Sequence, residues 1–487
     1  MFTPFLLAQS HALLAVLLAT PLSATSPTSP MPPPIFELRV GSERIAIHDL
    51  NAAAFGQFEL TRPVEVSIRT EYDVRWVDIR PRSARIEAVI SADHGTIRFT
   101  VTKPVALTIE FNGDWKRAVH LFATPPEKSP PATDAPKVRR FGPGVHEVGE
   151  IVLQDGESVY LEKGSWVKGH IKAVKAKNIT ISGRGVLDGD FVVPEPPPTE
   201  KKAQPYGNVR SMIRFEDVQD ARIEGITIVN SKTWTVLLRR SKGIRVSGIH
   251  ILNAGSPCTT DGIDVVSSSD VVIEDVFIRT NDDNIAVKNL DSAERISDIT
   301  VRRAVFWNEK CGNAIEIGFE LRTGVLENIR FEDIDIIRVE RGAAISIHNG
   351  DAATVKNVVF DNLRVEDARH KLIDFAIVWG AYGKDRPASR EDRQKMSDRG
   401  GAWDAVLRAA PDVRKEQAEY RGHVENITVR NLHVVEGAHP FSVIAGYDEA
   451  HVVKGVTIEN LRVGEKRIRT EKEAKLSKEF APGLRLR

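Results

Sequence analysis

One pattern recurs through the second half of the chain: two short apolar runs joined at a Gly, Asn or Asp. The residues that open the second run of each copy are Ile226, Ile249, Val276, Ala304, Ile334, Leu363, Leu432 and Leu461. They follow one another at intervals of 23 to 30 residues, except for one gap of 69 residues before Leu432. Repeats of this length built from β-type runs are typical of a solenoid, in which each repeat forms one coil. The sequence therefore predicts a parallel β-helix.

The residue before many of these anchors suits a bend between strands. These residues are Asp275, Asp333, Asn362, Asn431 and Asn460. Asn and Asp tolerate the left-handed backbone conformation, and stacked side-chain amides can bond from coil to coil. We expect a bend at the same place in successive coils.

Three runs can be aligned in the middle of the repeats, at Thr260 to Val265, Asp282 to Lys288 and Gly312 to Gly318. The common register is given by Ile263, Ile285 and Ile315, and Ile345 extends it by one coil. Two residues before these positions stand Asp261, Asp283 and Asn313, and Asp282 stands three before. If the runs are stacked strands, acids that are distant in sequence become neighbours in space.

Side chains alternate along a strand, so residues beside the inward isoleucines point outward. One predicted outward column holds Asp264, Ala286, Glu316 and Ser346, and a second holds Val266, Lys288, Gly318 and His348. This face combines acids with a lysine and a histidine. We expect a binding groove along it.

The chain before the repeats has a different character. Residues 35–124 contain short alternating runs with polar breaks, which favour a small antiparallel β-sandwich. This segment is interpreted as an accessory module, although Trp76 and Trp115 are candidates for stacking on sugar rings. A Pro-rich stretch, Pro125 to Pro136, follows. The predicted solenoid covers 138–470, with an insertion at 375–421 that we expect near the groove.

The N-terminal residues predict export. Ala12 to Ala19 is an unbroken apolar run, and small residues follow it up to Ala24. This is typical of a secretory signal peptide at 1–24, with a Ser/Thr/Pro linker at 25–34. No later segment has the roughly 20 apolar residues that a membrane span requires. We expect a secreted protein, extracellular or periplasmic, without a membrane partner.

The composition limits which kinds of molecule the chain is expected to bind. Lys plus Arg and Asp plus Glu both number 67, so bulk charge does not indicate binding to nucleic acid. The two cysteines, Cys258 and Cys311, stand two coils apart in the predicted register. At about 4.8 Å per coil they would lie roughly 10 Å apart, too far for a disulfide. We expect them to be packing residues that say nothing about the compartment.

The predicted acid cluster points to acid/base chemistry without a metal or another cofactor. Asp282 and Asp283 are adjacent and Asp261 lies about one coil away, so mutual repulsion favours a proton on one of them. A protonated acid beside a carboxylate that activates water is what cleavage of a glycosidic bond needs. Two other interpretations of the same residues are a Ca²⁺ site and a plain turn between coils.

These motifs resemble those of the polygalacturonases, glycoside hydrolase family 28. The resemblance rests on Gly183 to Gly189, Asn230-Ser231, Thr260 to Asp264 and Asp282 to Lys288, which occur in the family's order. It spans about residues 138–350. It implies a right-handed parallel β-helix that hydrolyses a polysaccharide or oligosaccharide by an inverting mechanism. If the family's catalytic roles are assigned to the matching positions, Asp282 is the general acid, and Asp261 and Asp283 bind and activate the water.

The chain departs from the family at two motifs. Gly312-Asn313-Ala314 stands where the family has Gly-His-Gly, and Ile345 to Asn349 contains no Arg or Lys where the family has Arg-Ile-Lys to hold a uronate. Family 49, the dextranases and isopullulanases, has the same β-helix with a preceding β-sandwich and no uronate clamp. A neutral α-glucan, dextran or pullulan, is therefore an alternative substrate.

Further candidates for substrate binding follow from the outward columns. They are Lys288, Asn313, Glu316, Asp264 and His348, with Trp234 and Trp307 as stacking platforms. Two other functions use the same scaffold. A polysaccharide lyase would need a base and usually Ca²⁺, and a glycan-binding protein would have no activity.

Overall fold

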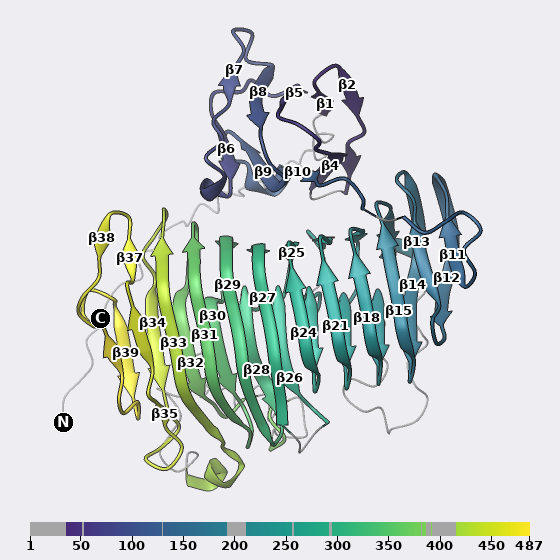
Figure 1. The fold of residues 1–487 in the computed structure, drawn as a ribbon. Coiled ribbons are helices and arrows are strands. Elements are labelled where there is room, and N and C mark those ends of the chain that lie inside the picture. The colour runs from purple at the N-terminus through teal and green to yellow at the C-terminus, as the bar shows by residue number, and fades with distance from the viewer. Residues whose placement is uncertain are drawn as a thin grey trace, which may run out of the picture.

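The computed structural model describes residues 36–487 apart from 51–52, 129, 192–210, 256–257, 292–294, 381, 386–390 and 392–414. It has a small two-sheet unit and a long coil of strands, as Figure 1 shows. The fold is a right-handed parallel β-helix preceded by a β-sandwich, which confirms the predicted fold class. The predicted signal peptide and linker, 1–34, lie outside the described residues.

The sandwich consists of two five-stranded sheets in the orders β2-β1-β5-β8-β7 and β3-β4-β10-β9-β6. Their strands are β1 (Phe36–Val40), β2 (Glu43–Ile45), β3 (His48–Asp49), β4 (Ala54–Glu59), β5 (Val64–Thr70), β6 (Val77–Arg80), β7 (Val89–Ile90), β8 (Thr96–Val101), β9 (Val105–Phe111) and β10 (Val119–Thr124). The strands fall within the predicted range. The expectation of purely antiparallel pairing is wrong in one place, because β4 and β10 are parallel.

The coil stacks its strands in three faces. The first face, which carries the predicted acids, contains β17 (Ile213–Glu216), β20 (Val236–Arg239), β23 (Ile263–Val266), β26 (Ile285–Asn289), β28 (Ile315–Leu321), β30 (Ala343–Asn349), β32 (Lys371–Ile377) and β34 (Phe441–Ala445). The second contains β15 (Lys177–Gly183), β18 (Gln219–Glu224), β21 (Lys242–Ser247), β24 (Ser269–Glu274), β27 (Arg295–Asn308), β29 (Val325–Val339), β31 (Thr354–Val365), β33 (His423–Val434) and β36 (Thr457–Glu459). The third begins with β16 (Val186–Asp188), β19 (Thr227–Val229), β22 (His250–Leu252) and β25 (Phe277–Thr280), and continues in the ends of β27 and β29.

The first coils are formed by β11 (Val138–Phe141), β12 (Gly144–Leu153), β13 (Ser158–Leu161) and β14 (Ser165–Val174). At the other end, β39 (Leu476–Glu479) pairs with β34, and β40 (Arg485–Leu486) pairs with β36. The predicted end at residue 470 is therefore wrong. These last strands are short and polar, so the apolar repeat does not reveal them. The insertion also starts later than predicted, because Phe375 to Ile377 belong to β32.

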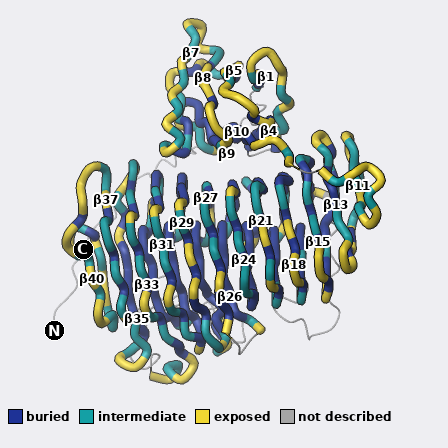
Figure 2. The backbone as a smooth tube through the Cα atoms, viewed as in Figure 1, coloured by how far each residue is buried: buried dark blue, intermediate teal, exposed yellow. Residues whose placement is uncertain are grey.

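The predicted register is confirmed. Ile263 pairs with Ile285, Ile285 with Ile315, and Ile315 with Ile345. Ile345 in turn pairs with Ile373, so one column of isoleucines runs through five coils. All five side chains are fully buried in a single apolar core that fills the tube. Figure 2 colours the backbone by burial and shows buried strand segments between exposed loops.

The bends between the second and third faces adopt the predicted left-handed conformation. Asp275, Asp333, Asn362, Asn431 and Asn460 all have φ between 55° and 56°. The predicted amide ladder is present in part. Asn362 donates to Asp333 over 3.1 Å, and Asn460 donates to Asn431 over 3.0 Å.

The sandwich packs against the third face of the coil. A shared apolar cluster joins Phe55 and Phe122 of the sandwich to Phe277 and Trp307 of the coil. Arg80 adds ion pairs across the boundary, with its guanidinium 2.7 Å from Glu366 and also in contact with Glu436. In Figure 1 the sandwich accordingly lies along the ends of β25, β27 and β29.

Two predicted sugar platforms lie in this interface. The ring centroids of Trp115 and Trp307 are 6.3 Å apart, and Arg338 lies 3.8 Å from the centroid of Trp115. Trp307 is fully buried. The prediction that these two rings stack on sugar is therefore wrong, whereas Trp76 is exposed.

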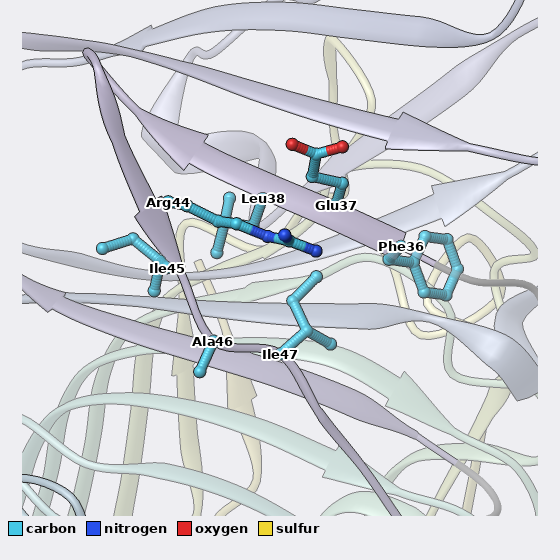
Figure 3. A pocket seen from close by; sticks show the side chains of 7 residues that line it. All are labelled: Phe36, Glu37, Leu38, Arg44, Ile45, Ala46 and Ile47. Atoms are coloured by element: carbon cyan, nitrogen blue, oxygen red, sulfur yellow. The ribbon is translucent and has the colours of Figure 1, made fainter.

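A hollow lies on the sandwich at β1 and β2 (Figure 3). It is lined by Phe36, Glu37, Leu38, Arg44, Ile45, Ala46 and Ile47. None of the predicted site residues lines it. Within the described residues, no helix combines the length and apolar character needed to cross a bilayer.

Candidate active site

The acids of the first face meet just before β23 and β26. Gly262 N donates to the carbonyl oxygen of Asp283, and Asn284 N donates to that of Asn313. This places Asp261, Asp283 and Asn313 side by side in consecutive coils, as the sequence predicted. Asn313 donates to Oδ1 of Asp283 from its main-chain nitrogen, over 2.6 Å, and from Nδ2, over 3.2 Å.

Asp282 is the partly exposed member of the cluster, whereas Asp261 and Asp283 are buried. Burial raises the pKa of Asp282 well above its usual value, and the neighbouring Asp261 and Asp283 add to this effect. Burial likewise raises the pKa of Asp283, with Asp261 and Glu316 contributing. A carboxyl group that keeps its proton beside solvent is suited to donating that proton.

The loop around Asp282 is tightly fixed. Asn308 Nδ2 donates to the carbonyl oxygen of Asp282 over 2.8 Å, and Cys311 N donates to that of Asn281 over 2.8 Å. Gly312 lies against this loop with φ of 67°, and a Cβ at that position would clash with Oδ1 of Asp282. Glycine is therefore required for this close approach.

Lys288 is surrounded by acids. Its Nζ lies 3.4 Å from Asp261, 3.3 Å from Asp264 and 3.8 Å from Glu320. The same Nζ lies 3.9 Å from the centroid of the Trp234 ring. Burial alone would lower the pKa of Lys288, but the surrounding carboxylates, Glu320 and Asp264 foremost, raise it well above its usual value. The ammonium therefore lies between the side chains of Asp261, Asp264 and Glu320.

A second ionic chain lies one coil further on. His348 Nδ1 is 2.8 Å from Glu316 Oε2, and His348 Nε2 is 3.0 Å from Asp374 Oδ2. Lys371 Nζ lies 2.5 Å from the same Asp374 oxygen. Burial would lower the pKa of His348, but the two carboxylates raise it to about 10. Burial would raise the pKa of Asp374, but His348 and Lys371 lower it below its usual value.

The two chains are connected through Asn313. Its Nδ2 donates to Oε2 of Glu316 over 2.9 Å and also to Oδ1 of Asp283. Ser346 donates a further hydrogen bond to Glu316. A continuous path of polar contacts thus leads from Lys371 to Asp283.

The expectation that the two cysteines are unbonded is wrong. Cys258 and Cys311 form a disulfide with their Cα atoms 5.6 Å apart. The predicted separation used the spacing of stacked strands, but both residues lie in loops before β23 and β28. Those loops leave the stack, so they approach each other across the intervening coil. The bond joins the loops on either side of the Asp282 loop.

Four residues expected to contact substrate are instead buried. Asp264 and Glu316 are completely buried, so neither reaches a surface where a sugar could bind. Asp264 lies beneath Lys288, and Glu316 beneath Asn313 and His348. His348 was expected at the edge of a groove, but it is enclosed between two carboxylates. Trp234 is nearly buried, and its ring faces Lys288.

Several members of the site were not among the predicted residues. Asp374 pairs with Ser346 in the ladder, so extending the predicted outward column by one coil would have found it. Tyr382, at the start of the insertion, packs 5.6 Å from Phe319, and Phe319 stacks on His348. Burial raises the pKa of Tyr382 to about 12, helped by Asp282 and Glu320. Tyr382 therefore belongs to the same electrostatic environment as the acids.

Part of the coil is similar to known proteins. Residues 150–381 match the model of glycosyl hydrolases family 28. The coil is polygalacturonase-like. This segment contains all of the acids described above, and the match confirms the family resemblance predicted from the motifs.

Curated relatives of this polygalacturonase-like coil include an exopolygalacturonase of Zea mays, 23% identical over 230 residues. That match covers 46% of this chain and 53% of the relative. A probable polygalacturonase of Vitis vinifera is 31% identical over 163 residues, 32% of each chain. The chain thus spans about half of the length of the Zea mays relative.

Among solved structures, Dex49A from Penicillium minioluteum aligns with a TM-score of 0.60 at 18% sequence identity. The alignment covers 86% of this chain and 79% of that one. At this identity the likeness concerns the fold.

Proposed function

We propose that this protein is a glycoside hydrolase that cleaves a polysaccharide or oligosaccharide with inversion of configuration. One observation carries the proposal: Asp261, Asp282 and Asp283 share one cluster, in which Asp282 alone is partly exposed and burial raises its pKa well above the usual value. The family 28 match over residues 150–381 supports the same reaction.

In the proposed reaction, Asp282 donates its proton to the glycosidic oxygen as the bond to the anomeric carbon breaks. A water molecule held by Asp261 and Asp283 attacks that carbon from the opposite side and loses one proton to the carboxylate of Asp261. Burial raises the pKa of Asp261 less than those of the other two acids, because Lys288 opposes the increase. Asp261 is therefore the readiest proton acceptor. Proton exchange with solvent returns both groups to their starting states.

The remaining groups hold this arrangement. Asn313 keeps Asp283 in place with two hydrogen bonds, and Lys288 compensates the charge of Asp261. We propose that these residues position the acids, and that no cofactor takes part. Tyr382 and Asp282 supply the polar groups at the partly exposed end of the cluster.

We also propose that the protein is secreted. The apolar run from Ala12 to Ala19 supports this. The disulfide between Cys258 and Cys311 adds a second reason, because such bonds persist in oxidising compartments outside the cytosol.

The test compares the wild type with Asp282→Asn on a panel of glycans, using the release of reducing ends as the readout. We expect the variant to lose about 10²- to 10⁴-fold in kcat, the usual contribution of a general acid. Asp275→Asn is a matched control, because Asp275 is an exposed acid in the preceding bend with φ of 56°, which Asn also adopts. Proton NMR of the first-formed product should show the inverted anomer. Wild-type turnover by Asp282→Asn would remove Asp282 from the acid role, and an unsaturated product would identify a lyase instead.

A further inference from the structure

Among the described residues, the cations that lie between these acids are Lys288, His348 and Lys371, and each contacts the protein's own carboxylates. We propose that the sugar cleaved at this site is uncharged, with hydroxyl groups and no carboxylate at the position over Asp282 and Lys288. This inference rests on the proposed hydrolase function and specifies its substrate class.

Lys288 is the first cation to consider, because it lies next to Asp261. Its ammonium contacts three carboxylates and the face of Trp234, and only 5% of the residue is exposed. An ammonium has three donors, and here three acidic side chains surround it. A substrate carboxylate that approached Lys288 would also meet those acids.

His348 is the second cation. Both of its ring nitrogens contact carboxylates, Glu316 on one side and Asp374 on the other. Lys371 contacts Asp374 as well. His348 lies two coils beyond Lys288 on the first face, where a positive group could have faced a bound anion. Its charge is instead neutralised within the protein.

Two arginines that contact Tyr382 or Asp385 also have partners within the protein. Arg322 contacts Asp351 over 2.6 Å and donates to the carbonyl oxygen of Tyr382 over 2.8 Å. Arg421 contacts Asp385 over 2.5 Å, and its side chain is 0% exposed. Both arginines have structural partners.

Acids outnumber bases at this site among the described residues. Lys288, His348 and Lys371 face the acids Asp261, Asp264, Asp282, Asp283, Glu316, Glu320 and Asp374. Seven carboxyl groups therefore surround three basic side chains in this part of the described structure. An anionic sugar would therefore be repelled. A neutral sugar would meet carboxylate oxygens, which readily accept hydrogen bonds from hydroxyl groups.

The experiment uses pairs of polymers that differ only in charge. Neutral glucans and galactans of several linkages are each compared with the same polymer oxidised at C6 to the uronate. We expect one neutral polymer to be cleaved with a kcat/KM at least about 10-fold above that of its uronate form. Preferred cleavage of a uronate polymer would overturn this inference while supporting the hydrolase. No cleavage of any neutral or uronate polymer would contradict the proposed function itself.

A variant tests the electrostatic cause. Glu320→Gln removes one negative charge beside Lys288, so the ratio between the neutral polymer and its uronate form should decrease. Glu332→Gln is the control, because Glu332 pairs with Arg330 on the second face of the coil. An unchanged ratio in Glu320→Gln would contradict the role assigned to these charges.

Discussion

His348 Nδ1 lies 2.8 Å from Oε2 of Glu316, which joins two neighbouring coils by a charged contact inside the first face. Asp374 contacts the other nitrogen from the next coil, so three consecutive strands, β28, β30 and β32, are connected through one ring. Asn313 extends this connection to Asp283. The ring is thus a support for the acids rather than a group that meets substrate.

Replacing this ring should destabilise the protein in a pH-dependent way. His348→Gln leaves Glu316 and Asp374 without their shared cation, which typically costs about 3–5 kcal/mol of unfolding free energy. In the wild type the pKa of His348 is raised to about 10 in the folded state, from about 6.5 when unfolded. The folded state therefore holds more protons between these values, so stability is greatest below about pH 6.5 and decreases up to about pH 10.

Urea unfolding at a series of pH values measures this effect. The decrease above pH 6.5 should be smaller in His348→Gln than in the wild type. His94→Asn is a control, because His94 is a half-exposed residue of the sandwich whose φ of 54° suits Asn. Identical pH dependence in wild type and His348→Gln would show that the ring is uncharged.

Lys288 should control the pH range of activity. It lowers the pKa values of Asp261, Asp282 and Asp283, against the larger effect of burial. In Lys288→Met the base would hold its proton to higher pH, so the acidic limb of kcat/KM should shift upward by about one unit. Lys242→Met, at an exposed lysine of β21, should leave the profile unchanged. An unshifted acidic limb with a lower rate would mean that Lys288 acts only through packing.

The disulfide should stabilise both the fold and the loop that holds Asp282. Its partners are 53 residues apart, and closing a loop of that length in the unfolded chain is worth about 4 kcal/mol. The double variant Cys258→Ser/Cys311→Ser should show a lower melting temperature and a lower kcat. Thiol titration of the unfolded wild type with and without reductant verifies the bond. Two free thiols without reductant would contradict it.

Arg80 should hold the sandwich on the coil. It contacts Glu110, Glu366 and Glu436, and burial raises the pKa of Glu366 to about 7. Arg80→Met leaves these acids without their shared cation, with an expected loss of about 3–5 kcal/mol. Limited proteolysis between Pro125 and Pro136 should become faster. Arg75→Met, at an exposed pair with Asp73, should have no effect. Equal proteolysis rates for Arg80→Met and the wild type would show that the apolar contacts hold the sandwich without it.

The sequence was sufficient for the parts of the molecule that repeat. The isoleucine register, the left-handed bends and the adjacency of Asp261, Asp283 and Asn313 all follow from a spacing that each coil copies. The alternation of inward and outward side chains also identified the positions of Glu316 and His348. The alternation of side chains could not reveal that Glu316 and His348 are buried, because their burial depends on side chains from neighbouring coils.

The wrong or missing predictions concern segments that lie outside the repeated strands. Cys258 and Cys311 meet through loops whose path the strand spacing does not describe. Trp115 and Trp307 are far apart in the sequence, although the docked sandwich brings their rings together. Tyr382 reaches the acids from the insertion, where no periodic signal assigns its position.

The identical bends at Asp333, Asn362, Asn431 and Asn460 make each turn of the tube interchangeable with its neighbours. Adding a whole turn beyond β33 would lengthen the molecule by about 4.8 Å without altering the geometry around Asp282. The overall length of this protein can therefore be adjusted independently of its chemistry.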